Sequence, residues 1–196
     1  MREAIDSEAL PYKIKEGDAA FYGPKIDVDV RDAIGRKWQL STIQLDFNHP
    51  ERFDLEYVAA DNTRKRPIML HRALFGSLER FFGVLIEHYA GAFPTWLSPV
   101  QVRVLGVRDD HDGYARSVVD RCKAHGLRAD LIEADEPLGS RIRKAKLEKI
   151  PYVLVVGDDD IANATVGVNA RGKDVERGVA VDAFLERVGA EVAARA

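Results

Sequence analysis

Residues 69–82, MLHRALFGSLERFF, carry the most specific chemistry in this sequence. Taken as a helix with 100° per residue, the segment places Arg80 between Gly76 and Gly83, on the side opposite an apolar stripe. A glycine in a helix interior costs about 1 kcal/mol relative to alanine. Two glycines beside one guanidinium therefore predict a smooth surface for a flat or anionic ligand. Close packing of the helix on a sheet, with a solvated Arg80, is the alternative, and the geometry alone favours neither.

Amide side chains mark a second segment, WQLSTIQLDF at residues 38–47. Gln39 and Gln44 suit hydrogen bonding to a small polar ligand better than packing against a helix. The alternative is a solvent-facing sheet surface. Because these glutamines are five positions apart, an ideal strand places them on opposite faces. A bulge or break near residues 41–42 is needed to bring both to one site.

The elements that position these residues predict an α+β first part. Residues 25–31 alternate between apolar and charged side chains, as a half-buried strand does. We expect a turn at residues 32–35, a second strand or a bulged pair of strands at 36–47, a further strand at 66–70, and then the helix that carries Arg80. This part is therefore expected to be an antiparallel sheet with one helix.

Strands and helices alternate after a linker near Gly91–Pro99, which carries two prolines and a glycine. We divide the chain accordingly into domains at residues 1–95 and 96–196. The alternation predicts an α/β domain, with a parallel or mixed sheet covered by helices on both faces. The expected strands are 100–107, 127–132, 152–157, 165–169 and 178–181, and the expected helices are 112–125, 139–150 and 182 onward.

Composition excludes several classes of protein. Of the 196 residues 46% are hydrophobic and 31% charged, which indicates a packed globular protein rather than a disordered one. No apolar run approaches the length of a membrane span, and the first residues show no signal-peptide pattern. The single Cys122 excludes an internal disulfide and is typical of the reducing cytoplasm. With a net charge of −3, any nucleic-acid binding requires a local basic patch.

Three strings of residues closely resemble one family. FYGPKIDVDV at 21–30, WQLSTIQLDF at 38–47 and IMLHRALFGSLERF at 68–81 resemble the last part of the catalytic domain of bacterial threonyl-tRNA synthetases. The second half looks like the five-stranded anticodon-binding domain that follows it in these class IIa enzymes. The resemblance runs over nearly the whole chain, in the same order and with the same spacing.

The resemblance implies roles for the residues above. Arg80 ends the third signature motif of class II synthetases and would meet the triphosphate of ATP, which is bound with Mg²⁺. A guanidinium suits this role, because it is always charged and grips phosphate through two hydrogen bonds. It would also stabilise charge on the leaving pyrophosphate. Gln39 would face the nucleotide, whereas Gln44, Tyr22 and Lys25 would line the threonine pocket.

The resemblance also implies that His71 is the third ligand of a zinc ion that holds the amino group and hydroxyl of threonine. At a helix start its imidazole would stay neutral, as a metal requires. The cysteine and histidine that complete the family's site have no counterpart upstream, and Cys122 lies in the other domain. We therefore expect this chain alone not to hold zinc.

In the second domain the resemblance implies that Asp135, Arg143, Asp160 and Asn169 read the anticodon. Arg143 belongs to a basic helix at residues 139–150, a local footprint for phosphate, with a merely solvated face as the alternative. Other members of the family have an asparagine at Asp135 and an arginine at Asn169. Without that arginine, bidentate reading of a base is lost at this position.

Two hypotheses for function remain. The first is a carboxyl-terminal part of an ATP-dependent threonine–tRNA ligase, which would act on threonine and its tRNA and be homodimeric in its full form. The family's first and second motifs are missing, so we expect no threonine activation by this chain alone. The second is a stand-alone tRNA-binding or regulatory paralogue with a non-catalytic synthetase remnant. The unchanged HRALFGSLERFF and STIQLDF strings favour the first hypothesis.

Overall fold

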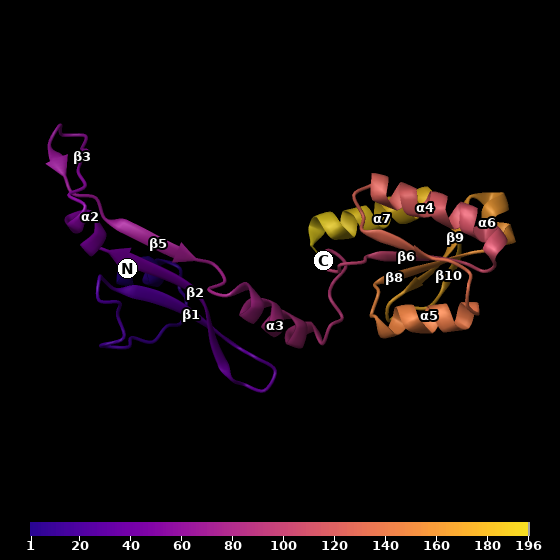
Figure 1. The fold of residues 1–196 in the computed structure, drawn as a ribbon, viewed down its shortest axis with the longest axis horizontal. Coiled ribbons are helices and arrows are strands. Elements are labelled where there is room, and N and C mark those ends of the chain that lie inside the picture. Colours follow the sequence, from indigo (N-terminus) through magenta and orange to yellow (C-terminus); the bar gives the residue numbers. More distant parts are fainter. Residues whose placement is uncertain (196) are drawn as a thin grey trace. The chain divides into compact units, whose positions relative to one another are not determined.

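A computed structural model describes residues 1–195, and it divides into two compact units, one formed by Met1–His88 and one that begins at Tyr89 (Figure 1). The first unit is built on an antiparallel sheet and the second on a mixed sheet covered by helices. The predicted combination of an α+β part and an α/β part is therefore confirmed. In the described part of the chain no helix combines the length and apolarity that crossing a membrane requires.

Three strands form the sheet of the first unit, in the order β1-β2-β5. Strands β1 (Lys25–Arg31) and β2 (Lys37–Asp46) lie where the alternation predicts them, joined by the predicted turn. Strand β5 (Met69–Ala73) begins three residues later than predicted, because Pro67 has no N–H to give to a ladder. The pattern does not predict four short elements of this unit: α1 (Arg2–Ser7), α2 (Asn48–Arg52), β3 (Tyr57–Val58) and β4 (Arg64–Lys65).

A β-bulge interrupts the pairing of β1 with β2. Val28 lies opposite Ser41 and Asp29 opposite Gln39, so Leu40 has no partner and is the extra residue. Beyond the bulge the side chains of β2 change face. Gln39 and Gln44 therefore point to the same face of the sheet, which confirms the predicted need for a bulge near this position.

Helix α3 (Leu78–Tyr89) begins later than the sequence pattern predicts. Gly76 is not inside the helix but in the turn before it, with φ of +63°. A Cβ at this position would lie 2.6 Å from the Leu40 carbonyl oxygen, so a glycine is required. His71 is likewise not at a helix start. It lies in β5 opposite Gln44, because residues 69–73 continue the ladder of β2.

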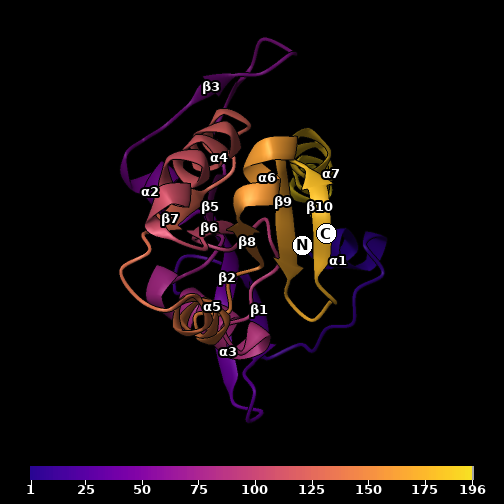
Figure 2. The ribbon, with the colours of Figure 1, turned by 90° about the vertical axis from the view of Figure 1, so that its right-hand side faces the viewer.

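The second unit contains a five-stranded sheet in the order β10-β9-β8-β6-β7 (Figure 2). Strand β6 is parallel to both of its neighbours, whereas β9 is antiparallel to β8 and β10. Its strands are β6 (Val102–Gly106), β7 (Ala129–Ile132), β8 (Tyr152–Val156), β9 (Thr165–Ala170) and β10 (Glu176–Ala180), and its helices are η1 (Asp109–His111), α4 (Asp112–Ala124), α5 (Leu138–Leu147), α6 (Asp158–Asn163) and α7 (Val181–Ala194).

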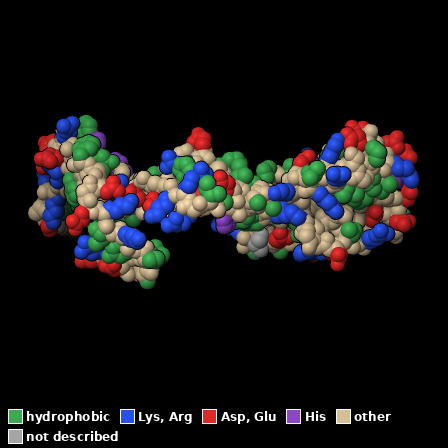
Figure 3. Space-filling model, turned by 90° about the horizontal axis from the view of Figure 1, so that it is seen from below, with side chains coloured by type: hydrophobic (Ala, Val, Ile, Leu, Met, Phe, Trp, Pro, Cys, Tyr) green, Lys and Arg blue, Asp and Glu red, His purple; other side chains and the backbone are tan. Residues whose placement is uncertain are grey.

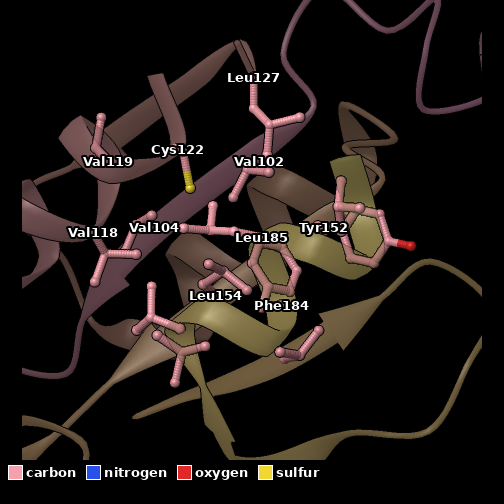
Figure 4. Packing of buried hydrophobic residues seen from close by; sticks show 14 of the residues in the cluster. Val102, Val104, Val118, Val119, Cys122, Leu127, Tyr152, Leu154, Phe184 and Leu185 are labelled. Carbon is pink, nitrogen blue, oxygen red and sulfur yellow. The ribbon is translucent and has the colours of Figure 1, made fainter. Parts of the chain in front are cut away.

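Two hydrophobic clusters cover the two faces of this sheet. The larger joins Val102, Val104 and Leu154 to the buried sides of α4 and α7, and Figure 4 shows Phe184 and Tyr152 within it. Their rings meet edge to face with centroids 5.5 Å apart. The smaller cluster joins Leu105 and Val153 to α5. Both faces are thus apolar, which explains the continuous hydrophobic run of β8.

The replacement Phe184→Ala should lower the free energy of unfolding of this unit by about 3–5 kcal/mol. The ring is fully buried, and its removal leaves a cavity between α7 and the sheet. Urea unfolding of the full chain, followed by tryptophan fluorescence and circular dichroism, measures the change. The control is Leu147→Ala, at a side chain 72% exposed, which should change the value by less than about 0.5 kcal/mol.

Candidate functional site

The polar face of the first sheet brings several predicted residues together. Because of the bulge, Lys25, Gln39 and Gln44 share this face with Asp27 and Thr42. Asp27 Oδ1 accepts hydrogen bonds from Gln39 Nε2 at 2.6 Å and Thr42 Oγ1 at 2.7 Å, and its Oδ2 lies 3.0 Å from Lys25 Nζ. Asp27, which the sequence pattern does not single out, thus connects the predicted nucleotide and threonine residues.

Burial alone would raise the pKa of Asp27. The hydrogen bonds from Thr42 and Lys25 and the lysine's charge outweigh burial and hold the pKa below its ordinary value. The same contact raises the pKa of Lys25. Both groups are therefore charged near neutral pH, and they present a cation beside amide groups on an open sheet face.

Tyr22, Gln44 and His71 form a second group on this face. Tyr22 Oη donates a hydrogen bond to Gln44 Oε1 at 2.6 Å, and the Tyr22 ring meets the His71 ring edge-on with centroids 6.0 Å apart. Gln44 and His71 are direct partners across β2 and β5. These residues offer a phenol, an amide and an imidazole side by side, which suits a small ligand with hydroxyl and amino groups.

Arg80 lies at the other end of β2. Its Nη1 donates to the Gln39 carbonyl oxygen at 2.8 Å, and its guanidinium carbon is 5.5 Å from the centroid of the Trp38 ring. At the adjacent Gly83, a Cβ would have no atom within 4 Å apart from its chain neighbours and the backbone of its own helix. The two residues assigned to ATP, Gln39 and Arg80, are thus in contact, with an unfilled surface beside them.

Asp32 hydrogen-bonds the indole of Trp38, the ring over which the Arg80 guanidinium lies. Its Oδ2 accepts hydrogen bonds from Trp38 Nε1 at 2.9 Å and Arg36 Nε at 2.5 Å. Burial opposes the carboxylate charge, but these bonds outweigh it and lower the pKa of Asp32 to about 2. The position of Trp38 therefore depends on an ionised Asp32.

A fully buried carboxylate, Asp46, lies between two imidazoles. Its Oδ1 accepts hydrogen bonds from the backbone N–H groups of Asn48 and His49 at 2.9 and 3.0 Å. Its Oδ2 is 2.8 Å from His71 Nε2 and also contacts His49 Nδ1. Burial opposes ionisation, yet these hydrogen bonds, led by the backbone of His49, hold the pKa of Asp46 well below its usual range.

The donor set of this cluster fits a metal ion. One ligand atom from each of Asp46, His49 and His71 lies within 4.8 Å of the others. Two histidines and a carboxylate are ligands that Zn²⁺ takes in proteins. The sequence pattern predicts only His71 as a ligand and misses Asp46 and His49, although their i, i+3 spacing at a strand end could have indicated the pair.

In the second unit, Asp160 and Asn169 line one open hollow of about 720 Å³. Asp160 Oδ1 accepts from Thr165 Oγ1 at 2.9 Å, and Asn169 Nδ2 donates to the Val153 carbonyl oxygen at 3.3 Å. Arg177 of β10 lines the same hollow, is exposed, and makes no ion pair among the described residues. The sequence pattern does not single out Arg177.

The basic helix provides fewer exposed cations than its sequence predicts. Arg141 is only 1% exposed and donates from Nε to the Glu136 carbonyl oxygen at 2.9 Å. Lys144 pairs with Glu136 at 2.5 Å. Arg143 and Lys146 are exposed and have no ion pair in the described part of the chain. Asp135 lies exposed in the turn before α5 and does not line the hollow.

Basic and acidic side chains are mixed over the face of the molecule that Figure 3 presents. The exposed surface there does not form a continuous basic field of the kind that would hold nucleic acid by charge alone. A nucleic-acid contact on that face would therefore use individual cations rather than a continuous basic surface.

Two family models match the chain. Residues 3–89 match the tRNA synthetase class II core domain (G, H, P, S and T), and residues 101–191 match the anticodon binding domain. Together the matches cover both compact units.

Individual relatives point in the same direction. A threonine–tRNA ligase of Nitrosococcus oceani is 54% identical over 193 residues, and one of Caldanaerobacter subterraneus is 52% identical over 194. Each match covers 98% of this chain and 30% of the relative, so the chain spans about a third of their length. The RNA binding domain of threonyl-tRNA synthetase from Cryptosporidium parvum Iowa II has a similar structure. Its TM-score is 0.89 at 34% identity, covering 96% of this chain and 48% of that one.

Trp38 fluorescence should change as the pH falls from about 4 to about 2. An unfolded Asp32 has an ordinary pKa near 4, against about 2 in the folded chain. The stabilisation from this carboxylate is therefore complete above pH 4 and is lost as the pH falls toward 2. Asp32→Asn should abolish this change.

Asp61→Asn is the matched control, because the pKa of Asp61 is also lowered to about 2, by Lys65 and Thr63, away from Trp38. This variant should keep the fluorescence change. A transition centred at pH 4 or above would show that Asp32 is not held ionised by Trp38 and Arg36.

Proposed function

We propose, since this chain belongs to the threonyl-tRNA synthetase family of class II aminoacyl-tRNA synthetases, that it acts as part of a ligase that activates threonine with ATP and transfers it to a threonine tRNA. Residues 1–95 would provide part of the activation site, and residues 96–196 would bind the anticodon. We place this activity in the cytoplasm, where the thiol of Cys122 stays reduced.

The observation that carries this proposal is the sorting of side chains along β2. At one end Arg80 Nη1 donates to the backbone carbonyl oxygen of Gln39, where the two residues would bind ATP with its Mg²⁺. Tyr22, Gln44 and His71 are in contact at the other end, where they would bind threonine. Asp27 connects Gln39 to Lys25 between the two groups. A nucleotide and an amino acid laid along one strand would meet as adenylyl transfer from ATP to the amino acid carboxylate, with release of pyrophosphate, requires.

The side chains derive their roles from their own chemistry. Arg80 would hold the triphosphate through parallel hydrogen bonds and stabilise charge that develops on the leaving pyrophosphate. Gln44, oriented by Tyr22, would hydrogen-bond the amino acid. A zinc ion, when bound at His71, would supply a Lewis acid for the hydroxyl of threonine. A site that engages this hydroxyl rejects an amino acid that carries a methyl group instead.

Arg177 supports the anticodon role of the second unit. The family's arginine is replaced by Asn169 in this chain, which removes a planar fork from the base-reading surface. Arg177 brings a guanidinium into the same hollow from the neighbouring strand β10. We infer that Arg177 takes over base reading beside Asp160 and Asn169, and that Asp135 and Arg143 contact the tRNA outside the hollow.

Arg177→Ala should weaken binding of a threonine tRNA about 10- to 100-fold, the usual loss of one bidentate base contact. Fluorescence anisotropy with the full chain measures this, with a tRNA of altered anticodon as the second ligand. The control is Arg116→Ala, which removes an exposed arginine of α4 that pairs with Glu133 at 2.9 Å. Equal losses in both variants, or equal affinity for both tRNAs, would contradict anticodon reading by Arg177.

A chimera tests the catalytic role. The matching 193 residues of the Nitrosococcus oceani ligase are replaced by this chain, and threonine-dependent ATP–pyrophosphate exchange is measured. The chimera should be active, and Arg80→Ala should lower its kcat about 100- to 1000-fold through lost charge stabilisation. Arg72→Ala, at an exposed arginine of β5, is the control. A folded but inactive chimera would instead identify the first unit as a non-catalytic remnant.

A further inference from the structure

We propose that Trp38 is a positioning residue for Arg80, and that Asp32 acts on Arg80 through Trp38. The indole holds the guanidinium where a triphosphate would bind, and it does so without cancelling the positive charge. This role rests on the proposed ligase function. It adds to that function two residues to which neither the sequence pattern nor the family resemblance gives a part.

The guanidinium of Arg80 needs support from outside its own helix. The side chain is long and exposed, so many rotamers are open to it. The backbone N–H of Arg80 is bonded to Ser77 Oγ at 3.1 Å, which fixes the start of α3 but not the guanidinium. Two other contacts do that: Nη1 donates to the Gln39 carbonyl oxygen at 2.8 Å, and the guanidinium carbon lies 5.5 Å from the centroid of the Trp38 ring. This distance is within the range of a cation–π interaction.

A second arginine over the same ring differs from Arg80 in its charge balance. The guanidinium carbon of Arg36 is also 5.5 Å from the centroid of the Trp38 ring. Two carboxylates face this group, with Arg36 Nε 2.5 Å from Asp32 Oδ2 and Arg36 Nη2 3.8 Å from Glu87 Oε1. Arg80, in contrast, forms no ion pair with any residue that the structure describes.

This difference suits a residue that must bind phosphate. A carboxylate beside Arg80 would repel a triphosphate and would compete with it for the same N–H groups. An aromatic ring and a backbone carbonyl restrict the guanidinium but carry no net charge. Trp38 therefore orients Arg80 and leaves its charge available to the nucleotide.

Asp32 fixes the ring in its turn. Its side chain is completely buried, and Oδ1 accepts hydrogen bonds from the backbone N–H groups of Ile34 and Arg36 at 3.1 and 2.8 Å. The carboxylate is thus anchored in the turn between β1 and β2. Oδ2 accepts from Trp38 Nε1 at 2.9 Å, the one hydrogen bond that an indole can donate. Without this bond the ring would be free to rotate beneath Arg80.

The chimera of this chain with the Nitrosococcus oceani ligase measures the role as threonine-dependent ATP–pyrophosphate exchange. Trp38→Leu should lower kcat about 10- to 100-fold, because a catalytic group displaced by about 1 Å loses activity on this scale. The KM for threonine should stay within about twofold, since Tyr22 and Gln44 are bonded to each other at the other end of β2. Trp38→Phe keeps an aromatic face and should retain most of the kcat.

Pairs of variants separate positioning from a general effect on the fold. If Trp38 acts through Arg80, Trp38→Leu should lower kcat no further in a chain that already carries Arg80→Ala. Asp32→Asn should likewise have no further effect once Trp38→Leu is present. Trp96→Leu is the matched control, because it removes an indole of the second unit over which Arg195 lies at 5.9 Å. This variant should leave kcat unchanged.

Nuclear magnetic resonance of the full chain tests the contact apart from any activity. The face of an indole shifts the hydrogens of a side chain that lies over it upfield. The δ hydrogens of Arg80 should show this shift, lose it in Trp38→Leu and keep it in Trp96→Leu. In Asp32→Asn the shift should decrease, because the ring is no longer fixed.

The outcomes distinguish this role from the proposed function. An active chimera whose kcat is unchanged by Trp38→Leu would overturn the positioning role and leave the ligase function in place. Equal losses from Trp38→Leu with and without Arg80→Ala would also overturn it, because the ring would then serve the fold alone. A chimera that is inactive before any substitution would contradict the ligase function itself, and with it a role for Trp38 in that reaction. Circular dichroism and the Tm of each variant show that it is folded.

Discussion

The bulge at Leu40 is the constraint on which the first unit depends. Without it, Gln39 and the residues before it would point to the face that carries Ile26, Val28 and Ile43. The apolar contact of α3 with Leu40 and Val30 would then meet polar side chains. One unpaired residue thus separates an apolar face, which anchors α3, from a polar face that carries Lys25, Gln39 and Gln44. Gly76 follows from the same bulge, because the Leu40 carbonyl oxygen comes too close for any side chain.

Sequence patterns predict the three strands of the main sheet of this unit well, but they do not predict where its polar side chains lie. Alternation identifies β1, and the five-position spacing of Gln39 and Gln44 reveals that a bulge is required. The prediction that His71 lies at a helix start is wrong. The periodic apolar pattern from residue 74 onward resembles a helix that begins earlier than the observed one. Only the pairing of β5 with β2 shows that residues 69–73 are a strand. The sequence pattern does not identify Asp46 and His49 for a similar reason. Asp46 contacts His71, which lies 25 positions later in the sequence, so only the folded structure brings α2 and β5 together.

The second unit is more predictable because both faces of its sheet are buried. Apolar runs such as residues 152–156 allow few alternatives, and each predicted strand lies within two residues of an observed one. What the pattern cannot show is which cations remain at the surface. Arg141 and Arg143 belong to one basic stretch, but the first is enclosed by backbone carbonyls while the second is exposed. Arg177 enters the hollow only through the pairing of β10 with β9.

The thiol of Cys122 can report how often the second unit opens. The thiol is fully buried between α4 and the sheet, and burial raises its pKa to about 11. A thiol-specific reagent therefore meets neither an accessible sulfur nor a thiolate while the unit is closed. The rate of alkylation of Cys122 therefore measures how often residues 89–195 open, and the first unit does not contribute to it. A protein with one cysteine in one of its two units thus carries a unit-specific label without any engineering.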